Sequence, residues 1–307
     1  MSQSPVVRLM DVSKRIGGRT IIDRVSLEVN SGEVFGFLGP NGSGKTTTIR
    51  MMVGLMALSG GDIQIAGHSI KTEFPQAITQ VGAIVENPEM YKFLTGYQNL
   101  LHYARMNPGV TEQRIHEVVK LVGLSERIHD KVSKYSLGMR QRLGVAQAVI
   151  HRPKLLVLDE PTNGLDPAGI RELRDYLRLL AREEGTAVFV SSHMLSEMEL
   201  MCDRVAILQK GQIIDIRSIR AAVEETTHTA ENVLFEVDHP DAALGVLEGH
   251  SSGRVEDGAL IVTADRSTVA SINRRLVEAG INVYGIRVKS KSLEDQFLEV
   301  TAGDTIG

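Results

Sequence analysis

The clearest chemical signal in the sequence is the stretch Gly39-Pro40-Asn41-Gly42-Ser43-Gly44-Lys45-Thr46-Thr47, called here the phosphate loop. In such a pattern the glycines let backbone N–H groups turn toward an anion, and a following helix adds positive potential. Lys45 can reach the β- and γ-phosphates of a nucleotide, and the Thr46 hydroxyl can bind Mg²⁺. A chance match at a surface turn is the alternative. The flanks argue against it, because an apolar run, 34–38, precedes the loop and helical spacing follows over 48–53.

Two acidic residues, Asp159 and Glu160, follow a second apolar run at 155–158. At the carboxyl end of a strand, Asp159 can hold Mg²⁺ through its water shell. Glu160 can act as a general base on an attacking water molecule. Apolar runs that end in acids are common. The pair indicates a catalytic role only because it follows a phosphate loop in the same chain.

His193 follows a third apolar run, 187–190, in the sequence Ser191-Ser192-His193. An isolated histidine is more often structural than functional. This one lies beyond the carboxyl end of a predicted strand of the same sheet, where α/β proteins bind their ligands. We therefore expect it to hydrogen-bond the γ-phosphate and the water molecule held by Glu160.

A second anion site is indicated at Ser136-Leu137-Gly138, just before a helix expected over 139–150. A serine hydroxyl and the free N–H groups at the start of a helix can bind an anion together. The alternative is an ordinary helix N-cap without a ligand.

The elements that must position these residues indicate an α/β fold. Buried strands are predicted by four apolar runs, at 34–38, 81–85, 155–158 and 187–190. Because helical patterns separate these runs, the core is expected to be a largely parallel sheet. Residues 6–29 alternate apolar and polar side chains around Gly17-Gly18, which predicts a small antiparallel sheet ahead of the phosphate loop. Helical spacing dominates residues 88–150, which are predicted to form a helical subdomain.

A second domain is predicted after the polar stretch 224–229, so the chain is divided into 1–220 and 225–307. The pattern favours a small α+β domain of βαββαβ order. Its strands are expected at 233–237, 254–256, 260–263 and 283–288, and its helices at 241–247, 268–278 and 293–300.

Composition excludes several classes of protein. The chain has 307 residues, with 34 Lys+Arg against 38 Asp+Glu and a net charge of −4, so no basic surface for nucleic acid or lipid headgroups is expected. The single Cys202 excludes an internal disulfide and a cysteine metal cluster, and it fits a reducing compartment. No signal peptide and no membrane-spanning run are recognised. A cytoplasmic location is expected, which is compatible with docking on a membrane partner.

Taken in order, the phosphate loop, Ser-Leu-Gly-Met-Arg-Gln, Leu-Asp-Glu-Pro-Thr-Asn-Gly-Leu-Asp and Ser-Ser-His resemble an ATP-binding cassette (ABC) ATPase over residues 6–218. The resemblance implies a P-loop NTPase cassette that uses ATP and Mg²⁺. It also implies that two cassettes pack head to tail, with each ATP between one phosphate loop and the opposite signature. By that analogy Ser136, Gly138 and Gln141, which belong to the signature segment 136–141, act on the partner's ATP. Asp166 lies in the loop that communicates between the two sites.

The resemblance further implies an integral membrane permease as partner. The helical subdomain would meet it through residues 87–94, which include Tyr91 and Phe93. Ordinary subdomain core is the alternative for these aromatic residues. All the catalytic pieces occur in one chain, so a symmetric homodimer is the simpler expectation.

Two residues depart from the usual cassette pattern. Ile16 occupies the place of an aromatic residue that stacks on adenine, which leaves an apolar contact and loosens nucleotide selectivity. Glu86 replaces a glutamine that touches Mg²⁺ and the water molecule and relays to the membrane partner. A carboxylate is a stronger Mg²⁺ ligand than an amide, and it brings negative charge toward the γ-phosphate. A tolerated variant without functional meaning is the alternative.

Glu86, the signature and the chain length resemble the ATPase subunits of bacitracin-resistance and lantibiotic self-protection exporters. That resemblance implies a peripheral protein on the inner face of the cell membrane, with a C-terminal accessory domain for regulation or dimer contact. A non-transport ABC ATPase acting on nucleic acid or the ribosome is the alternative, disfavoured by a single cassette and an acidic balance. A P-loop kinase is also disfavoured, since it would leave the signature segment and His193 unexplained.

Overall fold

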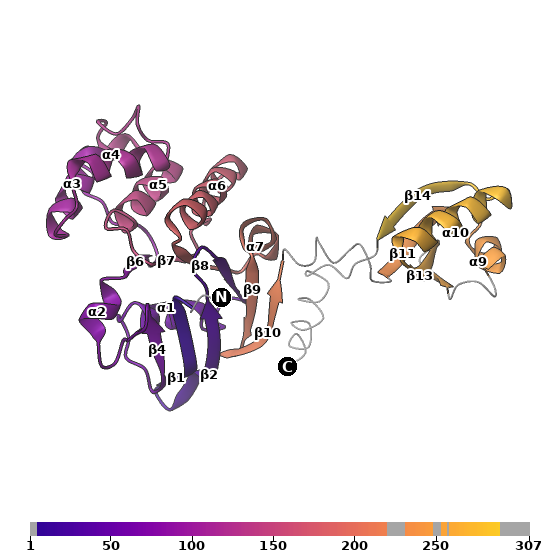
Figure 1. Ribbon diagram of the computed structural model, residues 1–307, viewed down its shortest axis with the longest axis horizontal. Helices are drawn as coiled ribbons and strands as arrows, with labels where there is room; N and C mark the ends of the chain where they lie inside the picture. Colours follow the sequence, from indigo (N-terminus) through magenta and orange to yellow (C-terminus); the bar gives the residue numbers. More distant parts are fainter. Residues whose placement is uncertain (1–4, 220–230, 248–252, 257, 289–307) are drawn as a thin grey trace. The chain divides into compact units, whose positions relative to one another are not determined.

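The computed structural model describes residues 5–219, 231–247, 253–256 and 258–288 (Figure 1). The chain forms two compact units, Met1–Ile219 and Arg220–Gly307. Within the described residues, none of the helices combines the length and the apolar character needed to span a bilayer.

The centre of the first unit is a six-stranded sheet in the order β10-β9-β3-β8-β7-β6. Its strands are β3 (Val34–Leu38), β6 (Val81–Ile84), β7 (Leu155–Asp159), β8 (Ala187–Ser192), β9 (Arg204–Gln209) and β10 (Gln212–Ser218). All neighbours are parallel except β9 and β10, which form an antiparallel hairpin at one end of the sheet order. Strands β3, β7 and β8 are buried at every residue, as expected where both faces of a parallel sheet are covered. The predicted α/β core is confirmed.

The register of this sheet aligns the ends of its three central strands. Leu38 of β3 pairs with Ser192 of β8, and Ser191 of β8 pairs with Asp159 of β7. Because the strands are parallel, the segments that follow them leave the sheet at one edge. The phosphate loop, the acid pair and His193 therefore begin side by side.

A second, antiparallel sheet precedes the phosphate loop in sequence, as predicted. Its order is β2-β1-β4-β5, built from β1 (Val7–Ile16), β2 (Arg19–Val29), β4 (Gly60–Ile65) and β5 (His68–Ser69). Alternate residues of β2, including Val25, Leu27 and Val29, are buried in a core that also holds Phe37 and Ile49. One apolar core thus joins both sheets to α1 (Lys45–Met52), which starts at the end of the phosphate loop. The short α2 (Phe74–Ile78) lies beside this sheet.

The helical subdomain contains α3 (Gly96–Met106), α4 (Glu112–Leu121) and α5 (Leu137–Ala148), grouped at one end of the first unit in Figure 1. Each helix starts after a side-chain cap, at Thr95, Thr111 and Ser136. The Ser136 hydroxyl accepts a hydrogen bond from Met139 N at 3.2 Å, so α5 begins two residues earlier than predicted. The expectation that Gly138 precedes the helix is therefore wrong, because Gly138 lies in its first turn.

After the acid pair, the apolar spacing predicts a helix over 170–183, whereas α6 (Pro167–Glu184) begins three residues earlier. Asp166 is its N-cap and accepts a hydrogen bond from Gly169 N at 2.8 Å, while Pro167 occupies the first helical position. Both residues favour a helix start, and the apolar spacing that begins at Ile170 did not include them. Gly185, in the left-handed region with φ 65°, ends the helix. The remaining helix of this unit is α7 (Leu195–Met201).

Asn99 of α3 holds the segment that carries Tyr91. The Asn99 side chain is fully buried; it accepts a hydrogen bond from Tyr91 N at 2.9 Å and donates to the carbonyls of Tyr91 and Thr95 at 3.1 and 2.9 Å. Changing Asn99 to alanine should lower the free energy of unfolding by about 2–3 kcal/mol, because the Tyr91 backbone groups lose their partner. Denaturant titration measures this. The exposed Gln76→Ala is the control, and an equal effect of both would contradict the assignment.

The second unit has the element order β11 (Glu231–Val237), α9 (Pro240–Leu247), β12 (Gly253–Glu256), β13 (Ala259–Ala264), α10 (Arg266–Glu278) and β14 (Val283–Val288). This is the predicted βαββαβ order. The strands form one antiparallel sheet, β12-β13-β11-β14. Its core includes Phe235, Leu260, Val262 and Leu276. The helix expected over 293–300 lies outside the described residues.

Candidate active site

The phosphate loop wraps the start of α1 with a backbone that requires glycine at particular positions. Gly42 and Gly44 have φ angles of 80° and 109°, in the left-handed region that side chains disfavour. At Gly39 a Cβ would stand 2.4 Å from the Leu208 carbonyl oxygen, so a side chain cannot be accommodated there. Such alternation of backbone conformation turns N–H groups toward a common centre, which makes a concave anion site.

Lys45 is the buried cation of this loop, with 6% of its surface exposed. Its Nζ donates to the carbonyls of Gly39 and Pro40 at 2.7 and 3.3 Å. It also lies 3.2 Å from Glu160 Oε1. The ammonium group is therefore fixed between the loop and the acid pair.

Ser191 of β8 positions both residues of the acid pair. Its hydroxyl donates to Asp159 Oδ1 at 2.7 Å and accepts from Glu160 N at 2.9 Å. Asp159 is 4% exposed at the end of β7, and Glu160 has a φ of 48°. A left-handed φ at a glutamate is sparsely populated and needs support from its surroundings. Sequence reasoning did not assign a role to Ser191, although a serine pair at the end of an otherwise apolar strand is an unusual feature.

Glu160 connects the phosphate loop to His193. While Oε1 contacts Lys45, Oε2 accepts a hydrogen bond from His193 Nδ1 at 2.8 Å. An ionised carboxylate only accepts hydrogen bonds, so Nδ1 carries the proton. The geometry thus adds a direct contact between His193 and Glu160 to those expected from the sequence.

Glu197 is a further residue that sequence reasoning missed. Its buried carboxylate accepts hydrogen bonds from Thr162 at 2.6 Å and from Ser192 at 3.0 Å. It thereby ties the loop after Glu160 to the turn before His193. Its position in the first turn of α7 and its two partners come from the structure, and no pattern identified in the sequence indicates them.

A pocket of about 320 Å³ lies between the phosphate loop, Glu160 and His193. The lining contains eight residues selected from the sequence and two that were not, Ile21 and Asn163. The eight are Asn41, Gly42, Gly44, Lys45, Thr46, Thr47, Glu160 and His193. Ile21 comes from β2 and Asn163 from the loop that follows Glu160, so the antiparallel sheet and the acid loop both close the pocket.

Ten other selected residues, all in the described part of the chain, are not among those that line this pocket. Four of them belong to the phosphate loop or to the end of β7: Gly39, Pro40, Ser43 and Asp159. The other six are Ile16, Glu86, Ser136, Gly138, Gln141 and Asp166. Ile16 is 47% exposed at the end of β1. Glu86, with φ 70°, forms an ion pair with Arg50 of α1. Ser136, Gly138 and Gln141 lie at the N-terminal end of α5, and Asp166 caps α6. The structure of one chain therefore assembles only part of the selected set.

The loop fits a phosphate group. Ser43 Oγ is buried and has no hydrogen-bond partner within the described residues, and a phosphate oxygen would supply one. The oxygen atoms of Thr46 and Asp159 are of the kind that Mg²⁺ prefers beside nucleotide phosphates. Both groups therefore suit the residues present.

The parallel sheet and the phosphate loop define a nucleotide-binding protein of the P-loop class. A protein-family model described as ABC transporter matches residues 22–163. The uncharacterized ABC transporter ATP-binding protein YhcH of Bacillus subtilis (strain 168) is 58% identical over 98% of this chain and 97% of its own length. The bacitracin transport ATP-binding protein BcrA of Bacillus licheniformis is 37% identical over 99% of this chain and 100% of its own length.

A solved structure of an ATP-binding subunit of an ABC transporter is also similar, with a TM-score of 0.63 and 27% identity over 72% of this chain and 92% of that one. The chain belongs to the ATP-binding proteins of ABC transporters. It is an ATPase of the ATP-binding cassette family, as the resemblance implied.

Proposed function

We propose that this chain is the ATP-hydrolysing subunit of an exporter that removes a peptide antibiotic of the bacitracin or lantibiotic kind. The observation that carries the proposal is the likeness to the bacitracin transport protein, which extends over both units of the chain and not only over the cassette. The cassette would occupy residues 1–220, and residues 225–307 would form an accessory domain for regulation or dimer contact.

Hydrolysis is assigned to the residues that meet at the edge of the sheet. Lys45 would neutralise charge on the β- and γ-phosphates of ATP, and Thr46 and Asp159 would hold Mg²⁺, which would supply further positive charge beside those phosphates. Glu160 accepts a proton from the attacking water molecule. His193 orients the Glu160 carboxylate through Nδ1. A phosphate oxygen on Lys45 would replace its contact with Glu160 Oε1, so ATP binding frees that oxygen to act as a base.

The second half of each site is assigned to a second copy of the chain. Ser136, Gly138 and Gln141 would bind the partner's ATP through the N-terminal end of α5, where the N–H groups of the first turn have no intrahelical acceptor. Asp166, at the start of α6, would report the state of one site to the other. A homodimer is proposed because one chain contains both halves.

Roles are also assigned to Glu86 and Ile16, the two residues that depart from the usual cassette pattern. The ion pair with Arg50 balances the negative charge of Glu86, which allows a carboxylate near the γ-phosphate and Mg²⁺. Ile16 would provide an apolar contact for the adenine ring at the end of β1.

The contact with the permease is assigned to residues 87–94, at the start of the helical subdomain. Tyr91 and Phe93 are 46% and 69% exposed, and their rings lie 5.8 Å apart. Aromatic residues are enriched where proteins bind one another. The chain would therefore work at the inner face of the cell membrane, on a separately encoded integral membrane protein. No nucleic-acid partner is proposed.

The test uses the chain together with a candidate permease taken from the reading frames next to its gene. Co-expression in a sensitive host should raise the concentration of bacitracin needed to stop growth, and Glu160→Gln should abolish this protection. The permease should also co-purify with the chain. Protection against a lantibiotic but not bacitracin would identify the other peptide class. Unchanged sensitivity to both, with the complex formed, would contradict the proposed cargo.

A further inference from the structure

Two helices of one chain carry parts of the proposed sites: α5 begins within the signature segment and α6 follows the loop after Glu160, and their N-terminal ends lie close together. A Cβ at Gly164 would lie 2.7 Å from Leu137 Cδ2, and one at Gly138 would lie 3.7 Å from Leu165 Cδ2. Leu137 begins α5, and Leu165 directly precedes the N-cap of α6. The first turn of α5, which belongs to the signature segment, is therefore packed against the loop that follows Glu160.

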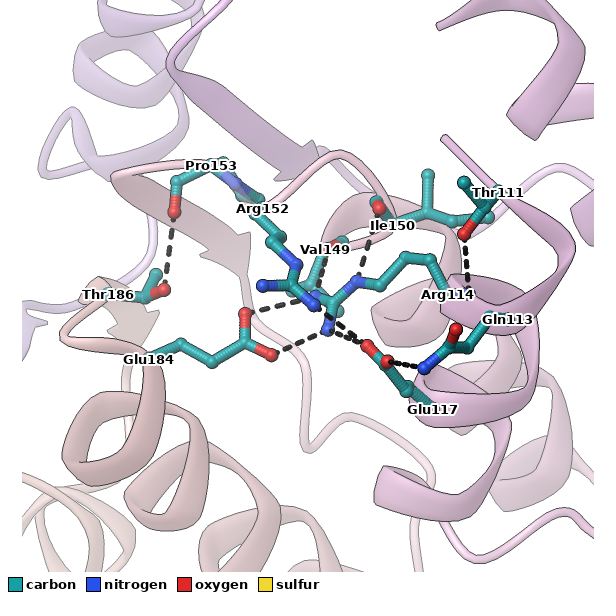
Figure 2. A network of polar contacts seen from close by, with 10 residues as sticks. All are labelled: Thr111, Gln113, Arg114, Glu117, Val149, Ile150, Arg152, Pro153, Glu184 and Thr186. Carbon is teal, nitrogen blue, oxygen red and sulfur yellow. Dashed lines mark hydrogen bonds and ion pairs between the residues drawn. The ribbon is translucent and has the colours of Figure 1, made fainter. Parts of the chain in front are cut away.

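The C-terminal ends of the same two helices are joined by one side chain, Arg114 of α4 (Figure 2). Its Nη1 and Nη2 donate to the two carboxylate oxygens of Glu184, the last residue of α6, at 2.7 and 2.9 Å. Nη2 also donates to the carbonyl of Val149 at 2.9 Å, and Nε donates to that of Ile150 at 3.3 Å. These two carbonyls follow the last residue of α5.

The Arg114 guanidinium is suited to this role by burial and by shape. Arg114 is 7% exposed, so its bonds are partly shielded from water. A fork-to-fork contact with a carboxylate fixes both distance and orientation, which a lysine ammonium cannot do. Glu117 supports it at 3.4 Å and is itself bound by Arg152 at 2.8 Å. Although burial raises the pKa of Glu117, the hydrogen bonds from Arg114 and Arg152 lower it below its ordinary value.

We infer that Arg114 is a positioning residue that holds α5 and α6 as one body and so sets where the signature segment meets the ATP of a second chain. The inference rests on the proposed function in one respect, the binding of ATP by Ser136 and Gly138 in trans. Among the described residues, the Arg114 side chain forms hydrogen bonds with α4, α6 and residues 149–150, and it does not line the pocket at the phosphate loop. Its loss therefore leaves the phosphate loop of its own chain intact.

Steady-state kinetics give the first test. Arg114→Gln, Arg114→Lys and Glu184→Gln should lower kcat by about tenfold or more, because small displacements of a positioned group are costly to catalysis. Equilibrium binding of ATP to the phosphate loop should change less than twofold. The neighbouring exposed Glu183→Gln is the matched control and should retain wild-type kcat. If Arg114→Gln does not fold, Glu184→Gln decides, since it keeps the bonds from Arg114 to Val149 and Ile150.

Mixed dimers give a sharper test. When a Lys45→Ala chain pairs with a Gly138→Asp chain, one site combines an intact loop with an intact signature, and the signature comes from the Lys45→Ala chain. Arg114→Gln added to that chain should lower the restored turnover by about tenfold or more. When Arg114→Gln is instead added to the Gly138→Asp chain, the turnover that remains should be at least fivefold higher than in the first placement. Equal losses from both placements would overturn the inference. Absence of any restored turnover from the mixture would instead contradict the proposed function.

Discussion

Replacing Glu160 with glutamine is expected to lower ATP turnover by about 10²- to 10⁴-fold while ATP stays bound, the range typical of losing a general base. Glutamine keeps the shape of the side chain and can still accept a hydrogen bond from His193 Nδ1. It cannot accept a proton from water. Because the substitution also removes the negative charge beside Lys45, affinity for ATP should rise or stay the same.

Phosphate release by the purified chain measures this effect, and equilibrium binding of labelled ATP measures retention. Glu126→Gln, at an exposed position outside the pocket, is the control for a change of one charge. Turnover that is undiminished in Glu160→Gln would contradict the general-base role. If ATP binding were lost together with turnover, the substitution would have disrupted the pocket, and the result would not support a role in proton transfer.

Mixing two inactive variants is expected to restore activity. Lys45→Ala removes the cation that binds the phosphates, and Gly138→Asp puts a carboxylate into the first turn of α5, where it repels them. Gly138 accepts a Cβ without strain, since the nearest atom would be Leu165 Cδ2 at 3.7 Å, so the variant should fold. In a head-to-tail pair, each mixed dimer has one site with both halves intact.

Random pairing at equal amounts makes half of the dimers mixed, and each of those has one intact site of two. Turnover should therefore recover to at most about one quarter of the wild-type value, for two-fold symmetric pairing. Each variant alone, at the same total concentration, supplies the baseline. Activity of the mixture equal to that baseline would mean that the signature and the phosphate loop do not meet between chains.

The strands of the first unit could be predicted because burial on both faces of a parallel sheet produces continuous apolar runs, as in β3, β7 and β8. The parallel arrangement also predicted that the phosphate loop, the acid pair and His193 would lie at the same edge of the sheet. The contacts at that edge could not be predicted in the same way. The hydrogen bonds of Ser191 depend on its pairing with Asp159 in the sheet register, which no local pattern specifies.

The starts of α5 and α6 show a second limit. Apolar spacing identifies the buried face of a helix, but the first turn is determined by capping residues whose spacing is different. Ser136 and Asp166 each cap a helix that begins at the next residue. Long-range links are harder still, since Arg114 and Glu184 are 70 positions apart and both read locally as ordinary charged helix residues.

In the second unit, the order of helices and strands followed from alternating patterns, yet the sheet order β12-β13-β11-β14 did not. The central position of β11 requires pairing with β13 and β14, which are distant in sequence. Each pairing depends on how the two helices cover the sheet, and this is a property of the whole domain.

The two contacts of the Glu160 carboxylate bear on how such an ATPase rests between cycles. Each oxygen already has a partner, Lys45 on one side and His193 on the other. In the proposed mechanism Oε1 is released only when a phosphate oxygen takes its place on Lys45, so the carboxylate would become available as a base only in a chain that has bound its substrate.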